Sequence, residues 1–474
     1  MILVYNHANQ YRCTIIRGKS QKEIDDLLPA YALIISDICP CVKEKFEEQF
    51  NERLKKYLPA DKQVKKTLDN HRTEIAGKLF GMYFASSQDD DAIVYPSERT
   101  LKFLEDNDQP AFFKDVCYKM QFPNGMSKPA NAYEVICNNV SIRQYCYLLK
   151  VLLLAKYANI TLTKSDIGYY VLNNLDVLQR KATPAEVIEQ IDKDRKNRIE
   201  RKVHTDGKAS SYDVQHINEQ INYLELANLV IIDDKDVSIN PNEMETVQMF
   251  ADEYNSDPMF DCSAYNFDTV EGRKFFSQKW NEYFSTLSSV SDKFATSIQA
   301  LSPTTEDKKE DKKKSTTGNK VELGDEGEEF IFEYEKKRVS AFNARLASKV
   351  IALGKQKGLG YDIQSVVAEP GDKAEYVKYI EVKSTKRVTA PDIDSTTWYD
   401  TLNITRNEFV AAQQHGDYYA VYRVYFTRDG VTVFVMNNIK KKYEDGKVEI
   451  TPLTYRVDFS SKAVDSVLDT SIGG

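Results

Sequence analysis

Residues 302–320 contain no large apolar side chain, and this stretch limits what the chain can fold into more than any other. It reads SPTTEDKKEDKKKSTTGNK. Because such a segment has nothing to bury in a core, we predict a flexible linker. Acidic residues are mixed with the lysines, which favours a solvated tether over a tail that contacts nucleic acid. The chain of 474 residues is therefore expected to fold as separate units before and after the linker.

The part before the linker is predicted to be α+β. Strand-like and helical runs alternate near the N-terminus. Several helices followed by a small hairpin come next, which is the order of a winged helix. Aromatic side chains then recur in a mostly helical segment, where they are typical of core packing. We expect an N-terminal α+β region at 1–140, a winged-helix-like domain at 141–245 and a helical bridge at 246–301.

Basic side chains gather near the end of one predicted helix of the winged-helix-like domain. This helix opens with the capping box Thr183-Pro184-Ala185-Glu186 and is predicted to continue past Ile199. A winged helix with a cluster of basic residues beside it is typical of a DNA-binding protein. The alternative is that these residues form an ordinary solvated helix face on a winged helix that binds protein. The net charge of −8 does not exclude a local basic face. The candidate DNA contacts are Arg195, Lys196, Arg198, Arg201 and Lys202, and 1–140 is a further candidate DNA-recognition region.

The part after the linker, 321–474, is predicted to form one domain. Its elements follow the order helix, strand, strand, helix, strand, which predicts a mixed sheet flanked by helices. A glycine-rich turn precedes the first strand, and a Pro-Gly turn joins it to the second. We expect a first helix around Phe330–Tyr334, a second at Ala341–Leu353, strands at Asp362–Val367 and Tyr376–Lys383, a crossover containing Thr405–Glu408, and strands at Tyr418–Phe426 and Val431–Met436.

Three charged residues of this domain are expected to meet at one point. Residues i and i+2 of a strand face the same side, so Glu381 and Lys383 project together. If Asp362 lies at the end of the neighbouring strand, two carboxylates and an ammonium converge, as in a metal-dependent phosphodiesterase site. The alternative is that Glu381 and Lys383 form an ordinary surface pair. Glu328 lies in the first turn of the predicted first helix, where it either joins this site or only caps the helix.

The domain resembles the PD-(D/E)XK nuclease superfamily, and more narrowly the nuclease-like domain at the C-terminus of the plant protein NO VEIN, which has relatives in bacterial restriction and defence proteins. The resemblance covers roughly residues 321 to 440 and rests on an ordered set of blocks. One departure is that Gly-Tyr rather than proline precedes Asp362. The blocks are Gly324-x-x-Gly327-Glu328, Gly360-Tyr361-Asp362-Ile363, Ile380-Glu381-Val382-Lys383-Ser384-Thr385, Thr405-Arg406-Asn407-Glu408 and Tyr418-x-x-x-Tyr422-Arg423-Val424.

The resemblance implies roles for these residues. Asp362, Glu381 and the backbone carbonyl of Val382 would bind Mg²⁺, with Mn²⁺ as the alternative. Lys383 would orient the attacking water, and Glu328 would act through a water or a second metal. Arg406 and Arg423 are candidates for phosphate contact. Thr405-x-x-Glu408 is a capping box, so Glu408 is interpreted as structural.

The function implied by these observations is a Mg²⁺-dependent restriction-type deoxyribonuclease in phage defence, whose N-terminal part selects a site on double-stranded DNA. A one-metal site cuts one strand, so cutting both requires a homodimer or two successive nicks. A cognate methyltransferase is an expected partner. The alternatives are a modification-dependent endonuclease and a non-catalytic winged-helix DNA-binding protein or complex subunit.

Location is inferred from what the sequence lacks. No targeting signal and no apolar stretch long enough to span a bilayer is recognised, so we expect a cytoplasmic protein without membrane contact. The seven scattered cysteines are consistent with reduced thiols.

Overall fold

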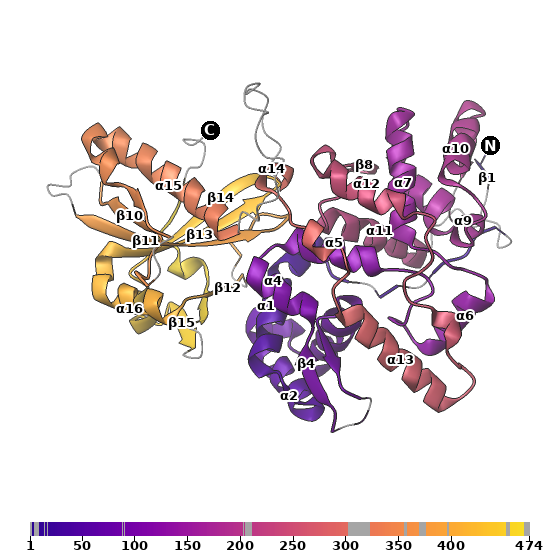
Figure 1. Cartoon of the computed structure of the whole chain (residues 1–474), viewed down its shortest axis with the longest axis horizontal. Helices are drawn as coiled ribbons and strands as arrows, with labels where there is room; N and C mark the ends of the chain where they lie inside the picture. Colours follow the sequence, from indigo (N-terminus) through magenta and orange to yellow (C-terminus); the bar gives the residue numbers. More distant parts are fainter. Residues whose placement is uncertain are drawn as a thin grey trace.

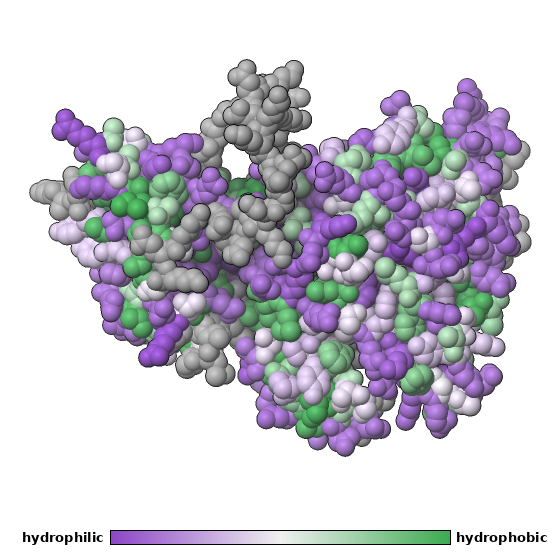
Figure 2. Space-filling model, in the orientation of Figure 1, coloured by the Kyte–Doolittle hydropathy of each residue, from purple (hydrophilic) through white to green (hydrophobic). Residues whose placement is uncertain are grey.

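A computed structural model gives the fold of the chain as two parts that lie side by side (Figure 1). Helices predominate in the N-terminal part, and a mixed sheet dominates the C-terminal part. Figure 2 shows a mainly hydrophilic surface on the face of Figure 1, with apolar side chains in scattered groups. The predicted linker, 302–320, and Lys202 lie outside the described residues. The structure describes residues 2–3, 9–13, 15–16, 18–87, 89, 91–201, 203, 211–301, 323–354, 358–368, 376–395, 398–451 and 456–468.

The first segment of the N-terminal part packs its helices around a small antiparallel sheet, in the order β2-β4-β3. Helix α1 is almost entirely apolar on its inner side and supplies much of the core, including Leu28, Ile34 and Ile35. The region therefore combines helices and strands, and its boundaries as a domain stay a prediction. The elements are α1 (Gln21–Ile38), β2 (Cys41–Val42), α2 (Lys43–Leu54), α3 (Lys65–Asp69), the π-helix η3 (Asn70–Leu79), β3 (Tyr83–Ala85), β4 (Ile93–Pro96), α4 (Glu98–Asp106), α5 (Gln109–Lys119) and α6 (Pro129–Cys137).

The next segment has the predicted helices and the predicted hairpin. Strands β7 and β8 pair antiparallel, and β5 adds to β8 to give the order β5-β8-β7. The name winged helix for this arrangement stays a prediction. The elements are α7 (Gln144–Tyr157), β5 (Leu162–Thr163), α8 (Lys164–Ile167), α9 (Leu175–Leu178), α10 (Pro184–Lys196), β6 (Glu200–Arg201), α11 (Ser211–Leu226), β7 (Val230–Asp233), β8 (Asp236–Ile239), α12 (Met244–Asp252), α13 (Val270–Ser285) and α14 (Ile298–Leu301).

One boundary in this segment was predicted wrongly. The capping box of Thr183 and Glu186 does open α10, but the helix ends at Lys196 instead of continuing past Ile199. Arg198 has a left-handed φ of 54°, and the following residues form β6, which pairs in parallel with β1 (Ile2–Leu3). Pairing with a distant segment therefore replaces the last turn of the predicted helix.

The C-terminal part contains a six-stranded sheet of order β17-β14-β13-β11-β10-β9. Strand β11 pairs antiparallel with β10 and parallel with β13, so the sheet is mixed, as predicted. Helices α15 and α16 cover opposite faces (Figure 1). The elements are α15 (Leu323–Phe342), β9 (Ile351–Ala352), β10 (Ile363–Val366), β11 (Val377–Lys386), β12 (Asp400–Asn403), α16 (Arg406–His415), β13 (Tyr419–Thr427), β14 (Gly430–Asn437), α17 (Ile439–Glu444), β15 (Val448–Thr451), β16 (Arg456–Phe459) and β17 (Ser466–Val467).

The predicted second helix of this part, Ala341–Leu353, is wrong. Helix α15 ends at Phe342, and Asn343 is extended and caps a short 3₁₀ segment, Ala344–Lys349. Residues Ile351 and Ala352 then pair with β10 as strand β9. Strand pairing therefore overrides the helical pattern of this stretch.

The two parts contact each other directly. Helix α14 precedes the predicted linker, yet Leu301 belongs to the apolar core of the C-terminal part. The end of β11 meets the junction of α4 and α5, where the Lys386 N–H donates to the Asn107 carbonyl at 3.1 Å. No helix among the described residues is long and apolar enough to span a membrane.

Candidate functional site

Strands β10 and β11 bring the predicted acidic residues to one place. Ile363 pairs with Ile380, and the Asp362 N–H donates to the Ile380 carbonyl at 2.9 Å. Asp362 therefore lies directly before β10 and beside Glu381. Ile380 and Val382 face the core under α15, so the alternation of the strand turns Glu381 and Lys383 to the side of α16.

The charged groups on this side are in direct contact. The Glu381 and Asp362 carboxyl groups are close enough to repel each other, and Asp362 Oδ2 accepts from the Val382 N–H at 2.8 Å. Lys383 Nζ lies 2.6 Å from Glu381 Oε1 and 3.0 Å from Glu408 Oε2. The structure thus brings together Asp362, Glu381 and Lys383 as the sequence predicted, and adds Glu408.

Burial shapes the electrostatics of this cluster. Only 2% of Glu381 is exposed, and burial, followed by the charges of Asp362 and Glu408, raises its pKa well above the usual value. Burial also raises the pKa of Asp362. Burial disfavours the Lys383 ammonium, but Glu381 and Glu408 outweigh it and raise the pKa of Lys383. Lys383 therefore stays protonated, beside two acids whose charged forms are disfavoured by burial.

The turn before Asp362 requires a glycine. Gly360 has a φ of +78°, and a Cβ added there would lie 2.4 Å from the Asn407 carbonyl oxygen. The Tyr419 hydroxyl donates to the Gly360 carbonyl at 3.0 Å. This close approach sets the N-terminus of α16 against the site. The predicted capping box of α16 is confirmed, with Thr405 and Glu408 bonded reciprocally.

Glu328 approaches from the other face of the sheet. It lies on α15 next to Gly327, which packs against Ser384. Its carboxylate lies against Gly354, where an added Cβ would be 2.0 Å from Oε2. Apart from the Val382 N–H on Asp362, the groups that act most strongly on Asp362 and Glu381 are Lys383, Glu408 and each other. A direct part for Glu328 in the site stays a prediction.

The donors at this site suit a hard divalent cation. Asp362 and Glu381 supply neighbouring carboxylate oxygens in a buried place, where a cation would offset their mutual repulsion. Among the described residues, no three His, Cys, Asp or Glu side chains form a group able to hold a metal ion. Mg²⁺ usually keeps several waters, so two carboxylates with water and main-chain oxygen are a compatible set. The N–H of Val382 is bonded to Asp362, and binding of a metal ion by the Val382 carbonyl stays a prediction.

The two arginines proposed for phosphate contact have different surroundings. Arg406 is exposed at the first position of α16. Arg423 is 4% exposed, and its Nε donates to Asp400 Oδ2 at 2.7 Å while Nη1 donates to the Ser384 carbonyl at 3.2 Å. A buried carboxylate on β12 thus holds the Arg423 guanidinium, and phosphate contact by either arginine stays a prediction.

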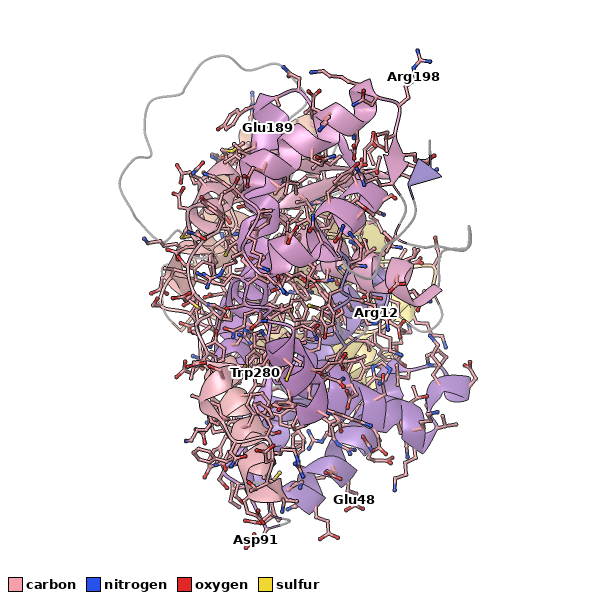
Figure 3. The ribbon with its side chains drawn as sticks, turned by 90° about the vertical axis from the view of Figure 1, so that its right-hand side faces the viewer. Arg12, Glu48, Asp91, Glu189, Arg198 and Trp280 are labelled. Atoms are coloured by element: carbon pink, nitrogen blue, oxygen red, sulfur yellow. The ribbon has the colours of Figure 1, made fainter. Side chains whose placement is uncertain are left out.

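The basic residues near the end of α10 are mostly paired with acids. Arg195 contacts Asp166 at 2.9 Å, and Lys196 is paired with Asp192 on the same helix. Arg201 is bonded to the buried Asp194. Figure 3 shows Arg198 at the outer end of the N-terminal part, with its side chain directed away from the body. DNA contact by Arg195, Lys196, Arg198 and Arg201 stays a prediction, and Lys202 is not described.

Sequence reasoning missed the contacts of two acids at this site. Asp400 stands in a stretch with no recognisable motif, and β12 was not predicted. Glu408 was recognised, but only as a helix cap. One sequence feature could have indicated the contact. Glu408 lies in the first turn of the crossover helix that follows the Glu-x-Lys strand, and this turn packs on the face of the sheet that carries Glu381 and Lys383.

Comparison with known proteins matches both parts of the chain. The family model "Restriction endonuclease BpuJI - N terminal" matches residues 5–281, more than half of the chain. The model "Protein NO VEIN, C-terminal" matches residues 327–436. No curated protein matches. A solved structure described as "pyrene- and phenanthrene-modified DNA in complex with the BpuJ1 endonuclease binding domain" is 52% identical, with a TM-score of 0.56. The match covers 59% of this chain and 99% of that one.

Proposed function

Because the chain belongs to the family of the BpuJI restriction endonuclease N-terminal region, we propose that it is a restriction-type deoxyribonuclease. The matched residues, 5–281, would bind double-stranded DNA, and the similar binding domain is described in complex with modified DNA. The C-terminal part would then hydrolyse a phosphodiester bond near the bound site. The 52% identity to that domain supports the DNA-binding half of the proposal.

The observation that carries the nuclease half is the contact of Asp362, Glu381 and Lys383 on adjacent strands. They form one connected cluster within the region that matches the NO VEIN C-terminal model. A mixed sheet with α15 and α16 on opposite faces supports the PD-(D/E)XK assignment. A surface pair of Glu381 and Lys383 would be exposed, whereas Glu381 is buried.

The proposed chemistry assigns each residue a separate task. Asp362 and Glu381 would hold Mg²⁺ or Mn²⁺, which when bound supplies a water-derived nucleophile and offsets charge on the scissile phosphate. Lys383 keeps its proton, so it can donate a hydrogen bond to the attacking water or to a phosphate oxygen. The Val382 N–H fixes the orientation of Asp362. Burial of Glu381 excludes bulk water from one side of the cluster.

The test is cleavage of phage and plasmid DNA by the purified chain with Mg²⁺, with Mn²⁺ and with EDTA. Methylated and unmethylated forms of each DNA are compared, because only activity separates an ordinary from a modification-dependent restriction enzyme. Discrete fragments with a divalent cation and none with EDTA are expected.

The matched variant is Lys383→Ala, which removes the ammonium and leaves both carboxylates. We expect cleavage to fall by about 10³-fold or more, while DNA binding in a gel-shift assay stays within about twofold. Full cleavage by this variant would refute the assigned site. Intact DNA in every reaction of the parent protein would instead favour a non-catalytic DNA-binding subunit.

A further inference from the structure

We propose that Glu408 is a positioning residue for Lys383, in addition to its role as the cap of α16. The inference rests on the proposed nuclease function, in which Lys383 must be aimed at the reacting groups. Lys383 Nζ lies between two carboxylates, at 2.6 Å from Glu381 Oε1 and at 3.0 Å from Glu408 Oε2. Of these two acids, only Glu381 is a predicted metal ligand.

The carboxylate of Glu408 is itself held rigidly. Its Oε2 accepts the Thr405 N–H at 2.9 Å, and the Thr405 hydroxyl accepts the Glu408 N–H at 3.3 Å. The same Oε2 therefore receives one donor from the start of α16 and one from Lys383. A capping box fixes the side-chain rotamer of its glutamate, so the helix start becomes an anchor of fixed position for the ammonium.

The turn at Gly360 ties this anchor to the acidic residues. The Asn407 carbonyl approaches the Gly360 Cα so closely that no larger residue fits, and Asp362 follows two positions later. Helix α16, the glycine turn and strand β11 thus form one connected unit around Lys383. Only 23% of the Lys383 side chain and 13% of the Glu408 side chain are exposed, so water screens their interaction only partly.

A second anchor matters because a lysine side chain has four rotatable bonds. In this structure Glu381 and Glu408 share the ammonium. When the Glu381 oxygens serve another partner, Glu408 still restrains Nζ on the face where the water and phosphate must lie. Small displacements of a catalytic group reduce the reaction rate by large factors. Loss of this restraint is therefore expected to lower the rate of the chemical step.

The chain contains a matched control for the capping role alone. Thr183 and Glu186 form the same capping box at the start of α10, with the Thr183 N–H to Glu186 Oε2 distance at 2.8 Å and the Glu186 N–H to Thr183 Oγ1 distance at 3.3 Å. Glu186 is exposed and lies in the other part of the molecule. A second control is Thr405→Ala, which breaks half of the α16 box and leaves Glu408 opposite Lys383.

The experiment compares Glu408→Ala, Glu408→Gln, Thr405→Ala and Glu186→Ala in the full chain. Single-turnover cleavage measures the chemical step, and the gel-shift dissociation constant measures DNA binding. Modification by an amine-reactive reagent, followed by peptide mass spectrometry, measures how strongly the neighbouring carboxylates hold the Lys383 ammonium, without any cleavage.

We expect Glu408→Ala to lower single-turnover cleavage by about 10- to 100-fold, with the dissociation constant unchanged and Lys383 modified several-fold faster. Glu408→Gln keeps an oxygen that accepts both donors, so it should recover part of the rate. Thr405→Ala and Glu186→Ala should leave the reactivity of Lys383 unchanged and the cleavage rate within about threefold.

Two results would overturn the inference. One is an equal loss of cleavage in Thr405→Ala and Glu408→Ala with unchanged Lys383 reactivity, which would make Glu408 a helix cap only. The other is unchanged cleavage and unchanged reactivity in Glu408→Ala. If the parent protein cleaves no DNA, the proposed function fails and the positioning role with it, whereas the reactivity of Lys383 still shows whether Glu408 holds the ammonium.

Discussion

His71 lies in the core of the N-terminal part with an exposed fraction of 0%. One ring nitrogen, Nδ1, contacts the Tyr31 hydroxyl, and among the described residues Nε2 has no hydrogen-bond partner. Burial, followed by the charges of Lys19 and Lys62, lowers the pKa of His71 from 6.5 to about 3. The imidazole is therefore neutral in the folded chain at pH values where the unfolded chain binds a proton.

This depressed pKa predicts a loss of stability in mild acid. The contribution is complete above pH 6.5 and is lost as the pH falls toward 3, because the unfolded state then binds the extra proton. Between pH 7 and pH 5 the free energy of unfolding should fall by about 2 kcal/mol through this group. Urea unfolding at pH 7 and pH 5 measures this loss of unfolding free energy. The loss in His71→Gln should be smaller than in the parent protein by about 2 kcal/mol. Equal losses in parent and variant would rule out His71 as the source, as would titration of the His71 ring signals near pH 6.5.

The sequence pattern predicted those residues of the candidate site that lie on a single β-hairpin. Asp362, Glu381 and Lys383 need only two neighbouring strands and the two-residue repeat of a strand. Arg423 could not be assigned in the same way, because its partner Asp400 stands on β12, a strand that no sequence pattern indicated. Glu408 shows the same limit, since its cap is visible in sequence but its contact with Lys383 depends on how α16 packs.

At the scale of elements, α15 and β11 approach so closely that a glycine is required between them. A Cβ added to Gly327 would lie 1.7 Å from Ser384 Oγ and 2.9 Å from Ser384 Cβ. Ser384 is adjacent to Lys383, so a shift of α15 would be transmitted to the candidate site. The Ser384 hydroxyl is buried and has no hydrogen-bond partner among the described residues. The contact between Gly327 and Ser384 is therefore one of van der Waals packing.

We predict that Gly327→Ala destabilises the protein by about 1–3 kcal/mol, as overpacking does in other cores, and lowers cleavage as well. Adding Ser384→Gly should restore most of the stability, because it removes both atoms that the new methyl group meets. Ser384→Ala alone serves as the control and should cost less than about 1 kcal/mol. Thermal unfolding of the four proteins checks this, and a double variant no more stable than Gly327→Ala would contradict the packing account.

Elements with strong local chemistry were predicted well, and elements made by distant pairing were not. The capping boxes of α10 and α16 and the β7–β8 hairpin carry their own polar or turn residues. Strand β9 lies in a stretch with helical periodicity and exists because β10 lies alongside it. The early end of α10 has the same cause, since β6 pairs with residues at the start of the chain.

At the scale of the whole molecule, the parts before and after the predicted linker contact each other. The Thr389 N–H donates to the buried Asp25 Oδ2 at 2.9 Å, and Arg387 contacts Asp26 at 2.7 Å. Beside these residues, Arg428 enters the N-terminal part from the turn between β13 and β14, and its N–H donates to the Val388 carbonyl at 3.3 Å. The sequence could not predict this, because each partner is an ordinary charged residue far away in the chain.

Arg428 supplies the densest of these contacts, which predicts that it couples the unfolding of the two parts. Its guanidinium donates to the Val230 carbonyl at 2.6 Å, to Asn228 Oδ1 at 2.9 Å and to Glu225 Oε1 at 3.2 Å. Arg428→Ala leaves the fully buried Asn228 side chain and a partly buried carboxylate without this donor, at a cost of about 2–4 kcal/mol. Calorimetry should show one unfolding transition in the parent protein and two in the variant.

The control is Lys440→Ala, which removes only an exposed pair with Glu444 and should change neither the number of transitions nor their temperatures. A single transition at the parent temperature in Arg428→Ala would mean that the apolar packing of α14 is sufficient to join the two parts.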